Sequence, residues 1–291
     1  MAEILKAKPV IKEIYQELAE ILKNPEIQPV LELLLIGDDP AATWYVNNLV
    51  KQGAKRGIQV RLHNLAPTIS QKELLRLINQ FNEDENVSGI MLQKPLPRHI
   101  NEEQITEAIS PAKDVDGFHP QNLGKMLLDQ DALLPCTPQA ALKIIEHYGV
   151  QTNGKHVVVL GRSNIVGKPL ANLLLRKSAT GNATVTVCHS KTKNIADHCL
   201  QADILIAAIG RAGFVTADMV KDGAVIIDVG TNLITDDAGI DKYVGDVDYE
   251  AVVSKVGAIT PVPGGVGSVT TALLLKNVVM AAKFAIKNKN Y

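Results

Sequence analysis

The sequence has little cysteine, few aromatic residues and almost no net charge. Three of its 291 residues are cysteines, 4% are aromatic, and the formal net charge at pH 7 is -1. The cysteines, Cys136, Cys188 and Cys199, lie far apart and form neither a CxxC motif nor a Cys/His ligand pattern, which argues against a disulfide framework and a zinc site. We therefore expect no bound metal. The balanced charge gives no electrostatic footprint for nucleic acid or a membrane, so neither is expected as a partner.

From the sequence we expect neither a signal peptide nor an apolar run long enough to cross a bilayer. Near the N-terminus, Ile11, Ile14 and Leu18 recur at helical spacing among charged residues. That pattern predicts an amphipathic helix and not a signal peptide. We expect a cytoplasmic protein.

Apolar runs and helical patterns alternate along the rest of the chain. Seven runs predict buried strands, at residues 30–37, 58–65, 87–92, 155–160, 183–190, 202–210 and 224–230. This alternation is typical of parallel βαβ units, and the length of the chain supports two domains. The predicted fold class is therefore α/β, with two α/β domains, of which the C-terminal one is a Rossmann-like parallel sheet.

Three helix starts are marked by their residues. Ser70 and Glu73 form a capping box for a helix that begins at Gln71. Thr137 is a predicted N-cap, with Pro138 at the first helical position. This punctuation marks the expected domain boundary. A final apolar helix is predicted to start near Thr270.

The stretch "VVVLGRSNIVGKPLANLLL" (157–175) runs from a strand through a glycine turn into a helix, which is the context of a dinucleotide fingerprint. The pattern is degenerate, since Gly161, Ser163 and Val166 fall on the three glycine positions and Gly167 comes one place late. A tight strand-to-helix turn without a ligand explains the pattern equally well.

The next predicted strand ends in "CHSKTK". In a dinucleotide fold this point meets the adenosine ribose, where NAD enzymes carry an acid and NADP enzymes a basic residue. Here His189, Ser190, Lys191 and Lys193 supply donors and positive charge, and Arg162 adds a guanidinium suited to phosphate. NADP is therefore expected over NAD. The alternative is a solvated basic loop.

Further candidate groups lie in three loops. The loop "TPVPGGVGSVTT" (260–271) leads into the last helix with glycines that permit close approach to a ligand, or that form a rigid turn. Asp114 and Asp116 are either ligand-binding carboxylates or ordinary turn residues. His119 precedes a proline and is expected to be structural. Gln93 ends a predicted strand, where open α/β sheets bind ligands, although the position requires no function.

These motifs together resemble a known family. "GDDPAATWYV", "QKPLP", "KDVDGFHPQNLG", "PCTP", "GRSNIVGKP", "VIIDVGTN", "VGDVD" and "ITPVPGGVG" occur in the order and spacing of bifunctional methylenetetrahydrofolate dehydrogenases/cyclohydrolases, from about Leu35 to the C-terminal helix. The resemblance implies NADP-dependent oxidation of 5,10-methylenetetrahydrofolate to 5,10-methenyltetrahydrofolate in one-carbon metabolism, then hydration to 10-formyltetrahydrofolate.

The resemblance also implies an organisation. It predicts a folate-binding catalytic domain of residues 1–137 plus 270–291, an NADP-binding domain of residues 138–269, a cleft between the two and a homodimer. The protein expected is thus an enzyme that uses NADP and binds tetrahydrofolate derivatives.

Residue roles follow from the matched motifs. Tyr45 matches the tyrosine that stacks on the aminobenzoyl ring, Asp116 the aspartate that reads the pterin donors, and Gln93 the glutamine beside a catalytic lysine. Pro263 and Gly264 are expected at the substrate. The residues expected to contact the cofactor are Gly161, Arg162, Ser163, Ile165, His189, Ser190, Gly210 and Thr231.

The family's catalytic lysine is missing. An alignment without gaps from Gly37 to Gly57 puts Leu49 at its position, and leucine cannot exchange protons with water. Lys51 lies about 200° further around the helix and faces away. Lys94 replaces an apolar residue beside Gln93, and either substitutes for the lysine or faces solvent. In the family this lysine also assists the dehydrogenase step, so we expect a working or weakened dehydrogenase with weak or absent cyclohydrolase activity. The alternatives are a dehydrogenase for another small substrate and a non-catalytic paralogue or partner subunit that binds folate or NADP.

Overall fold

The computed structural model describes residues 1–235 and 239–289, and the chain divides into two compact units. Unit 1 comprises Met1–Glu13 and Pro135–Thr270, and unit 2 comprises Ile14–Leu134 and Thr271–Tyr291. The divisions fall inside the first helix, α1 (Ala7–Ile21), and the last, α10 (Val266–Lys289).

The N-terminal residues lie in a different unit from the one expected. Glu3–Ile4 form a short strand, β1, that pairs in parallel with β11 (Ala258–Ile259) of unit 1. The Ala7 N–H also donates to the carbonyl of Gly264 at 2.8 Å. The expected domain of residues 1–137 would group the first thirteen residues with unit 2, whereas in the structure they form part of unit 1. The strand β1 was not predicted, because a two-residue strand has too little periodicity.

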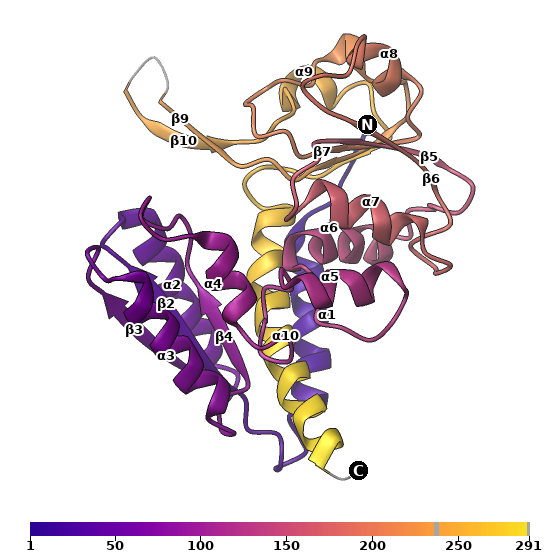
Figure 1. Ribbon diagram of the computed structural model, residues 1–291. Helices are drawn as coiled ribbons and strands as arrows, with labels where there is room; N and C mark the ends of the chain where they lie inside the picture. The colour runs from indigo at the N-terminus through magenta and orange to yellow at the C-terminus, as the bar shows by residue number, and fades with distance from the viewer. Residues whose placement is uncertain (236–238, 290–291) are drawn as a thin grey trace. The chain divides into compact units, whose positions relative to one another are not determined.

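Unit 2 is built on a three-stranded parallel sheet (Figure 1). Its strand order is β3 (Gln59–Leu65), β2 (Val30–Ile36) and β4 (Gly89–Leu92). Every residue of β2 is buried, because the central strand is covered on both faces. The predicted strands at 30–37, 58–65 and 87–92 are thus confirmed.

Helices cover both faces of this sheet. On one face, α3 (Gln71–Glu83) and α4 (Glu102–Ala108) bury an apolar cluster that includes Leu34, Leu74 and Ile105. On the other, α2 (Pro40–Ala54) packs so closely that a Cβ at Gly53 would lie 2.6 Å from Val60 of β3 and 3.7 Å from Leu275 of α10. The predicted capping box of Ser70 and Glu73 at α3 is confirmed.

Unit 1 is a doubly wound parallel sheet with the strand order β1-β11-β8-β7-β5-β6. The central strands, all paired in parallel, are β5 (His156–Leu160), β6 (Thr184–Cys188), β7 (Ile204–Ala207) and β8 (Val225–Asp228). The chain leaves β5 for β6 on one side and returns to β7 on the other. This reversal is the topological switch point of a Rossmann-like sheet, as predicted.

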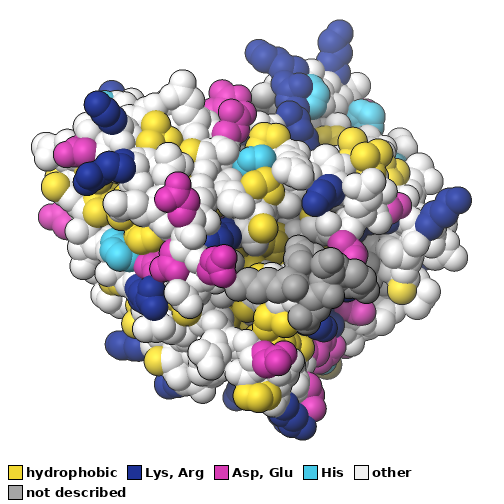
Figure 2. Space-filling view, turned by 60° about the horizontal axis from the view of Figure 1, so that its bottom comes forward, with side chains coloured by type: hydrophobic (Ala, Val, Ile, Leu, Met, Phe, Trp, Pro, Cys, Tyr) yellow, Lys and Arg dark blue, Asp and Glu magenta, His cyan; other side chains and the backbone are white. Residues whose placement is uncertain are grey.

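Helices flank this sheet as well. They are α6 (Cys136–His147), α7 (Gly167–Leu175), α8 (Ile195–Leu200), the 3-10 turn η1 (Ala217–Met219) and α9 (Tyr249–Val252). An antiparallel pair, β9 (Asn232–Thr235) and β10 (Asp241–Val244), extends from the sheet, and α5 (Pro120–Leu127) belongs to unit 2. The face shown in Figure 2 carries both acidic and basic side chains, with several basic ones together at its upper edge.

Two predicted helix starts are wrong. Helix α6 begins at Cys136 with Pro135 as its N-cap and no side-chain cap, so Thr137 is a first-turn residue. A proline in the first turn lacks an N–H that would have no helical partner, so the helix can begin before Pro138. Helix α10 begins at Val266, four residues before the expected start.

Helix α10 is also more apolar than expected. By length and composition it could cross a membrane, with a mean hydropathy of 1.5 over its best window, so the prediction that no such segment exists is wrong. Of that window, 61% is buried inside the protein, which is typical of a core helix.

Candidate functional site

The turn after β5 requires glycine at two positions. Gly161 has φ +120°, and a Cβ there would lie 2.1 Å from the carbonyl oxygen of Ala208, in the turn after β7. A Cβ at Gly167, the first residue of α7, would lie 2.1 Å from the carbonyl oxygen of Gly161. Gly167 therefore permits the close approach of helix to strand that the third glycine of a dinucleotide fingerprint provides. The one-residue offset in the sequence does not alter this geometry.

Ser163 organises the turn from within. Its Oγ accepts from the N–H groups of Val166 at 3.1 Å and Gly167 at 3.4 Å, and its carbonyl accepts from Lys168 at 3.1 Å. The N–H groups of residues 162–165 make no hydrogen bond within the described part of the chain. Since Arg162 and Ser163 are exposed, the turn offers a row of free backbone donors to an anionic ligand.

The turn after β6 presents further donors. Ser190, Lys191 and Lys193 are exposed. His189 is partly buried, and its Nδ1 accepts the Lys191 N–H at 3.2 Å. Its neutral ring therefore carries the proton on Nε2. No carboxylate occurs in this turn before Asp197, which lies in α8.

Two buried aspartates hold the turns after β7 and β8. Asp246 is 0% exposed, and its carboxylate accepts from the N–H groups of Ile209, Gly210 and Arg211 at 2.7 to 2.9 Å. It also accepts from the Asn232 side chain at 2.9 Å. Gly210 is thus placed by a residue that the sequence did not single out. The "VGDVD" motif that contains Asp246 was the available signal.

Asp228, at the end of β8, supports the same turns. It accepts from the N–H groups of Gly230, Asp246 and Val247, each at 3.0 Å. Burial raises its pKa to about 7, the Asp246 carboxylate adds to that shift, and the three N–H groups oppose it. Thr231 follows this clamp and is exposed.

The last loop of unit 1 follows β11. It contains a cis peptide before Pro263, and Gly264 has φ +100°. A Cβ at Gly265 would lie 2.4 Å from the Pro261 carbonyl oxygen. All the predicted cofactor residues, together with Pro263 and Gly264, therefore follow the carboxyl ends of parallel strands of one sheet. Open α/β sheets bind ligands at this edge.

In unit 2, the two aspartates of the loop between α4 and α5 have different surroundings. Asp114 is 3% exposed and accepts hydrogen bonds from the Gly117 N–H, the His119 N–H and the Asn122 side chain, at 2.7 to 3.1 Å. It is a loop-forming residue. His119 accepts the Gln121 N–H and caps α5, as its structural interpretation predicted. The predicted loop of residues 113–127 is helical from Pro120.

Asp116, in contrast, accepts no hydrogen bond from the described residues. It is partly buried, and burial raises its pKa to about 7, with a further contribution from Asp114 and an opposing one from Lys94. A carboxylate without protein donors can receive those of a ligand.

Lys94 lies beside this carboxylate. Its ammonium is 2.6 Å from Glu102 Oε1 and 4.8 Å from the centroid of the Phe118 ring. It lines one small cavity, of about 20 Å³, together with Asp116 and Phe118. The structure thus shows an ion-paired lysine, where the sequence offered a replacement for the catalytic lysine or a solvated side chain.

Gln93 carries an unsatisfied acceptor. Its Nε2 donates to the Lys94 carbonyl at 2.7 Å, while its Oε1 is buried and has no hydrogen-bond partner among the described residues. Such an atom is costly unless a ligand supplies a donor.

Helix α2 presents Tyr45 and Leu49 differently. Asp39 caps the helix by accepting the Ala42 N–H at 2.8 Å, and Pro40 is its first residue. Tyr45 is partly exposed, whereas Leu49 is 0% exposed and lies on the buried face. Lys51 is exposed. Position 49 on this helix face therefore carries no titratable group.

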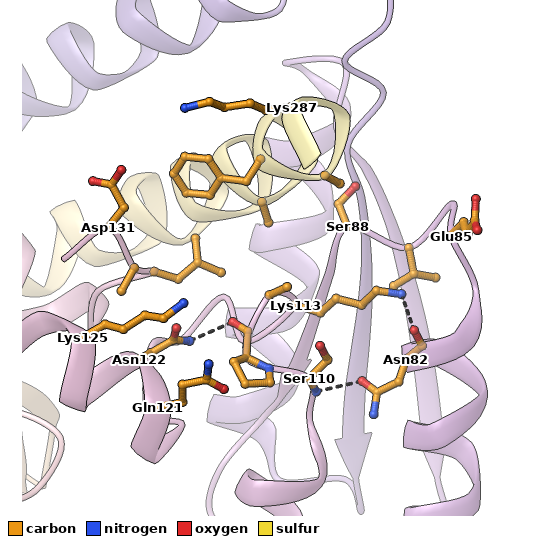
Figure 3. Close-up of a pocket in the computed structure, with 18 of the residues that line it drawn as sticks. Asn82, Glu85, Ser88, Ser110, Lys113, Gln121, Asn122, Lys125, Asp131 and Lys287 are labelled. Atoms are coloured by element: carbon orange, nitrogen blue, oxygen red, sulfur yellow. Dashed lines mark hydrogen bonds between the residues drawn. The ribbon is translucent and has the colours of Figure 1, made fainter. Parts of the chain in front are cut away.

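A larger cavity in unit 2 contains none of the predicted site residues. It has a volume of about 640 Å³ and is lined by the end of α3, the loop of residues 110–113, α5 and the C-terminal part of α10 (Figure 3). Its most buried cation, Lys113, donates to the carbonyls of Phe81, Asn82 and Asp84 at 2.7 to 2.8 Å. That ammonium is a cap for α3, and burial lowers its pKa.

Comparisons with known proteins bear on the whole chain. Residues 135–286 match the NAD(P)-binding domain of tetrahydrofolate dehydrogenase/cyclohydrolase, and residues 5–116 match its catalytic domain. The bifunctional protein FolD of Bacillus pumilus is 50% identical over 285 residues, which cover 97% of this chain and 98% of that protein. FolD of Campylobacter curvus is 49% identical over 278 residues, which cover 96% and 94%.

Comparison with solved structures gives the same family. The bifunctional FolD dehydrogenase/cyclohydrolase of Campylobacter jejuni matches with a TM-score of 0.91 and 44% identity, over 98% of this chain and 99% of that one. The Trypanosoma brucei dehydrogenase-cyclohydrolase, solved with NADP cofactor and inhibitor, matches with a TM-score of 0.90 and 35% identity, over 98% of both chains. With both domain models and half-identical relatives matched over nearly its full length, the chain belongs to the tetrahydrofolate dehydrogenase/cyclohydrolase family.

Proposed function

We propose that this protein oxidises 5,10-methylenetetrahydrofolate to 5,10-methenyltetrahydrofolate with NADP, and that it performs the following cyclohydrolase step weakly or not at all. The observation that carries the second part is the complete burial of Leu49 at the position of the family's catalytic lysine. The residues expected to bind the cofactor lie in unit 1, and most of those expected to bind folate lie in unit 2.

The residues of unit 1 fit NADP. The glycines of the β5 turn leave its backbone donors open, and Arg162 and Ser190 are exposed donors suited to a 2′-phosphate. The absence of a carboxylate in the turn after β6 favours NADP over NAD. Ile165, which is 41% exposed, offers apolar surface, while Gly210 and Thr231 offer backbone and hydroxyl contacts. When bound, NADP supplies the hydride acceptor.

The residues of unit 2 fit a reduced folate. Asp116 has free acceptor oxygens for the amine and ring N–H groups of a pterin. Tyr45 exposes part of its ring for stacking on the aminobenzoyl group. Gln93 Oε1 needs a donor, and the family places it beside the lysine that is missing here. We assign Pro263 and Gly264 to substrate contacts, residues 138–269 to the NADP-binding domain, and a homodimer to the assembly.

The two reaction steps make different demands on position 49. Oxidation removes a hydride from the one-carbon unit and depends on the positioning of two rings. Hydration adds water to the resulting methenyl cation and releases a proton, which requires a base. Leucine can accept no proton, so the hydration step lacks its main catalytic base. The oxidation step depends on the positioning of the two rings and should be affected less.

The dehydrogenase assay tests the first step. Purified protein should reduce NADP when 5,10-methylenetetrahydrofolate is added, and Asp116→Ala should weaken tetrahydrofolate binding at least tenfold. Asp131→Ala, which removes an exposed carboxylate of the same unit, is the matched control. Folate binding without any NADP reduction would support the non-catalytic alternative, and unchanged affinity in Asp116→Ala would contradict the folate assignment.

A further inference from the structure

One small cavity of unit 2 brings together four titratable side chains. Lys94 follows β4, Glu102 begins α4, and Asp114 and Asp116 lie in the loop before α5. The walls between them are apolar and include Ile90, Leu92 and Ile105, which are 1 to 6% exposed. One cation and three carboxylates therefore line a cavity whose other walls are apolar.

Lys94 is held in place within this cavity. Its ammonium contacts Glu102 Oε1 at 2.6 Å and lies 4.8 Å from the centre of the Phe118 ring. Its side chain is only 29% exposed. Two contacts from different segments fix the charge at this place, where a solvated lysine would sample many positions.

Asp116 differs from Asp114 in its hydrogen-bond partners. Asp114 receives three hydrogen bonds, whereas Asp116 receives none from the described residues. Burial and the Asp114 carboxylate both raise the pKa of Asp116, and Lys94 lowers it. Among the side chains lining the cavity, Lys94 supplies the single positive charge.

We propose that Lys94 is a positioning residue for the substrate: its ammonium raises the ionised fraction of Asp116, so that both carboxylate oxygens can accept hydrogen bonds from an amine and a ring N–H. A neutral carboxyl group would turn an O–H donor toward the same donors. The inference rests on the proposed function and adds to it a residue that stands where the family has an apolar one. Lys94 thus acts through Asp116 and does not replace the missing lysine.

Two measurements on Lys94→Met test the proposal. NMR titration of the Asp116 carboxyl carbon needs no ligand and should show a pKa about one unit higher than in the unchanged protein. With values near 7 and 8, the ionised fraction at pH 7 falls from about one half to about one eleventh. The Kd for tetrahydrofolate, measured by calorimetry, should therefore rise about fivefold at pH 7 and return to within about 1.2-fold by pH 9.

Control variants separate charge from shape. Lys94→Arg keeps the charge and should retain the original pH profile, while Lys72→Met removes an exposed lysine of α3 and should change nothing. An unshifted Asp116 titration, or a loss of affinity equal at pH 7 and pH 9, would overturn the proposal. If the unchanged protein failed to bind tetrahydrofolate, the proposed function would fail as well, whereas a pH-independent effect of Lys94→Met with normal binding would overturn this inference alone.

Discussion

Replacement of Leu49 by lysine reverses the departure on which the proposed function depends. Leu49 lies one turn after Tyr45 on α2, and long helical side chains lean toward the N-terminus of their helix. The introduced ammonium would therefore extend along Tyr45, which is partly exposed. We expect this variant to gain cyclohydrolase activity and to lose stability.

The loss of stability follows from burial. Leu49 is 0% exposed, and removal of its apolar side chain costs about 2 kcal/mol. A lysine in such a place has a pKa of about 6, against about 10.4 in the unfolded chain. Between these values the unfolded chain binds more protons, so the free energy of unfolding rises with pH. The ionisation deficit is about 4 to 5 kcal/mol at pH 7 and disappears above about pH 10.

The gain of activity is measured as hydrolysis of 5,10-methenyltetrahydrofolate above the buffer background. A positioned general base contributes about 10² to 10⁴ in rate, and imperfect placement should still leave at least a tenfold increase. The rate should rise with pH through the depressed pKa of the introduced lysine. Val46→Lys is the matched control, because Val46 is also 0% exposed on the same helix face.

Val46→Lys should lose comparable stability without gaining hydrolysis. A folded Leu49→Lys variant that binds tetrahydrofolate and hydrolyses no faster than the unchanged protein would refute the reasoning. Equal gains in both variants would show that any buried lysine suffices and that position 49 is not special.

Three further predictions concern single groups. Arg162→Met should raise the KM for NADP about tenfold and leave that for NAD within about twofold, because one charge-assisted phosphate contact is lost; steady-state kinetics with both cofactors checks this. Asp246→Ala leaves four donors without an acceptor. It should lower the free energy of unfolding, measured by denaturant titration, by about 3 to 5 kcal/mol, and weaken NADP binding, measured by calorimetry. The control Asp222→Ala, at a side chain that is 87% exposed, should change neither. Our proposal makes the ionised form of Asp116 the acceptor, and burial raises its pKa to about 7, so tetrahydrofolate affinity should increase between pH 6 and pH 8; a flat profile would contradict this.

Short apolar runs bounded by turn residues were enough to predict most of the sheet strands. β2, β5 and β8 are short buried runs bounded by turn residues, a pattern consistent with buried strands. The strand β1 was missed because two residues carry no period. Its partner β11 was missed for the same reason.

Individual side-chain roles were harder to predict than elements. Asp114 and Asp116 are two residues apart and alike in sequence, and only the folded loop gives one of them three donors and the other none. The ion pair of Lys94 with Glu102 joins residues of different segments, which sequence spacing does not specify. Tertiary contact decides such roles.

The most direct test of the proposed function is the rate at which the purified protein hydrolyses 5,10-methenyltetrahydrofolate, measured beside its rate of NADP reduction with 5,10-methylenetetrahydrofolate. The burial of Leu49 at the lysine position predicts NADP reduction with hydrolysis at the buffer background. Hydrolysis well above that background would contradict it and would require another group to take the proton from water.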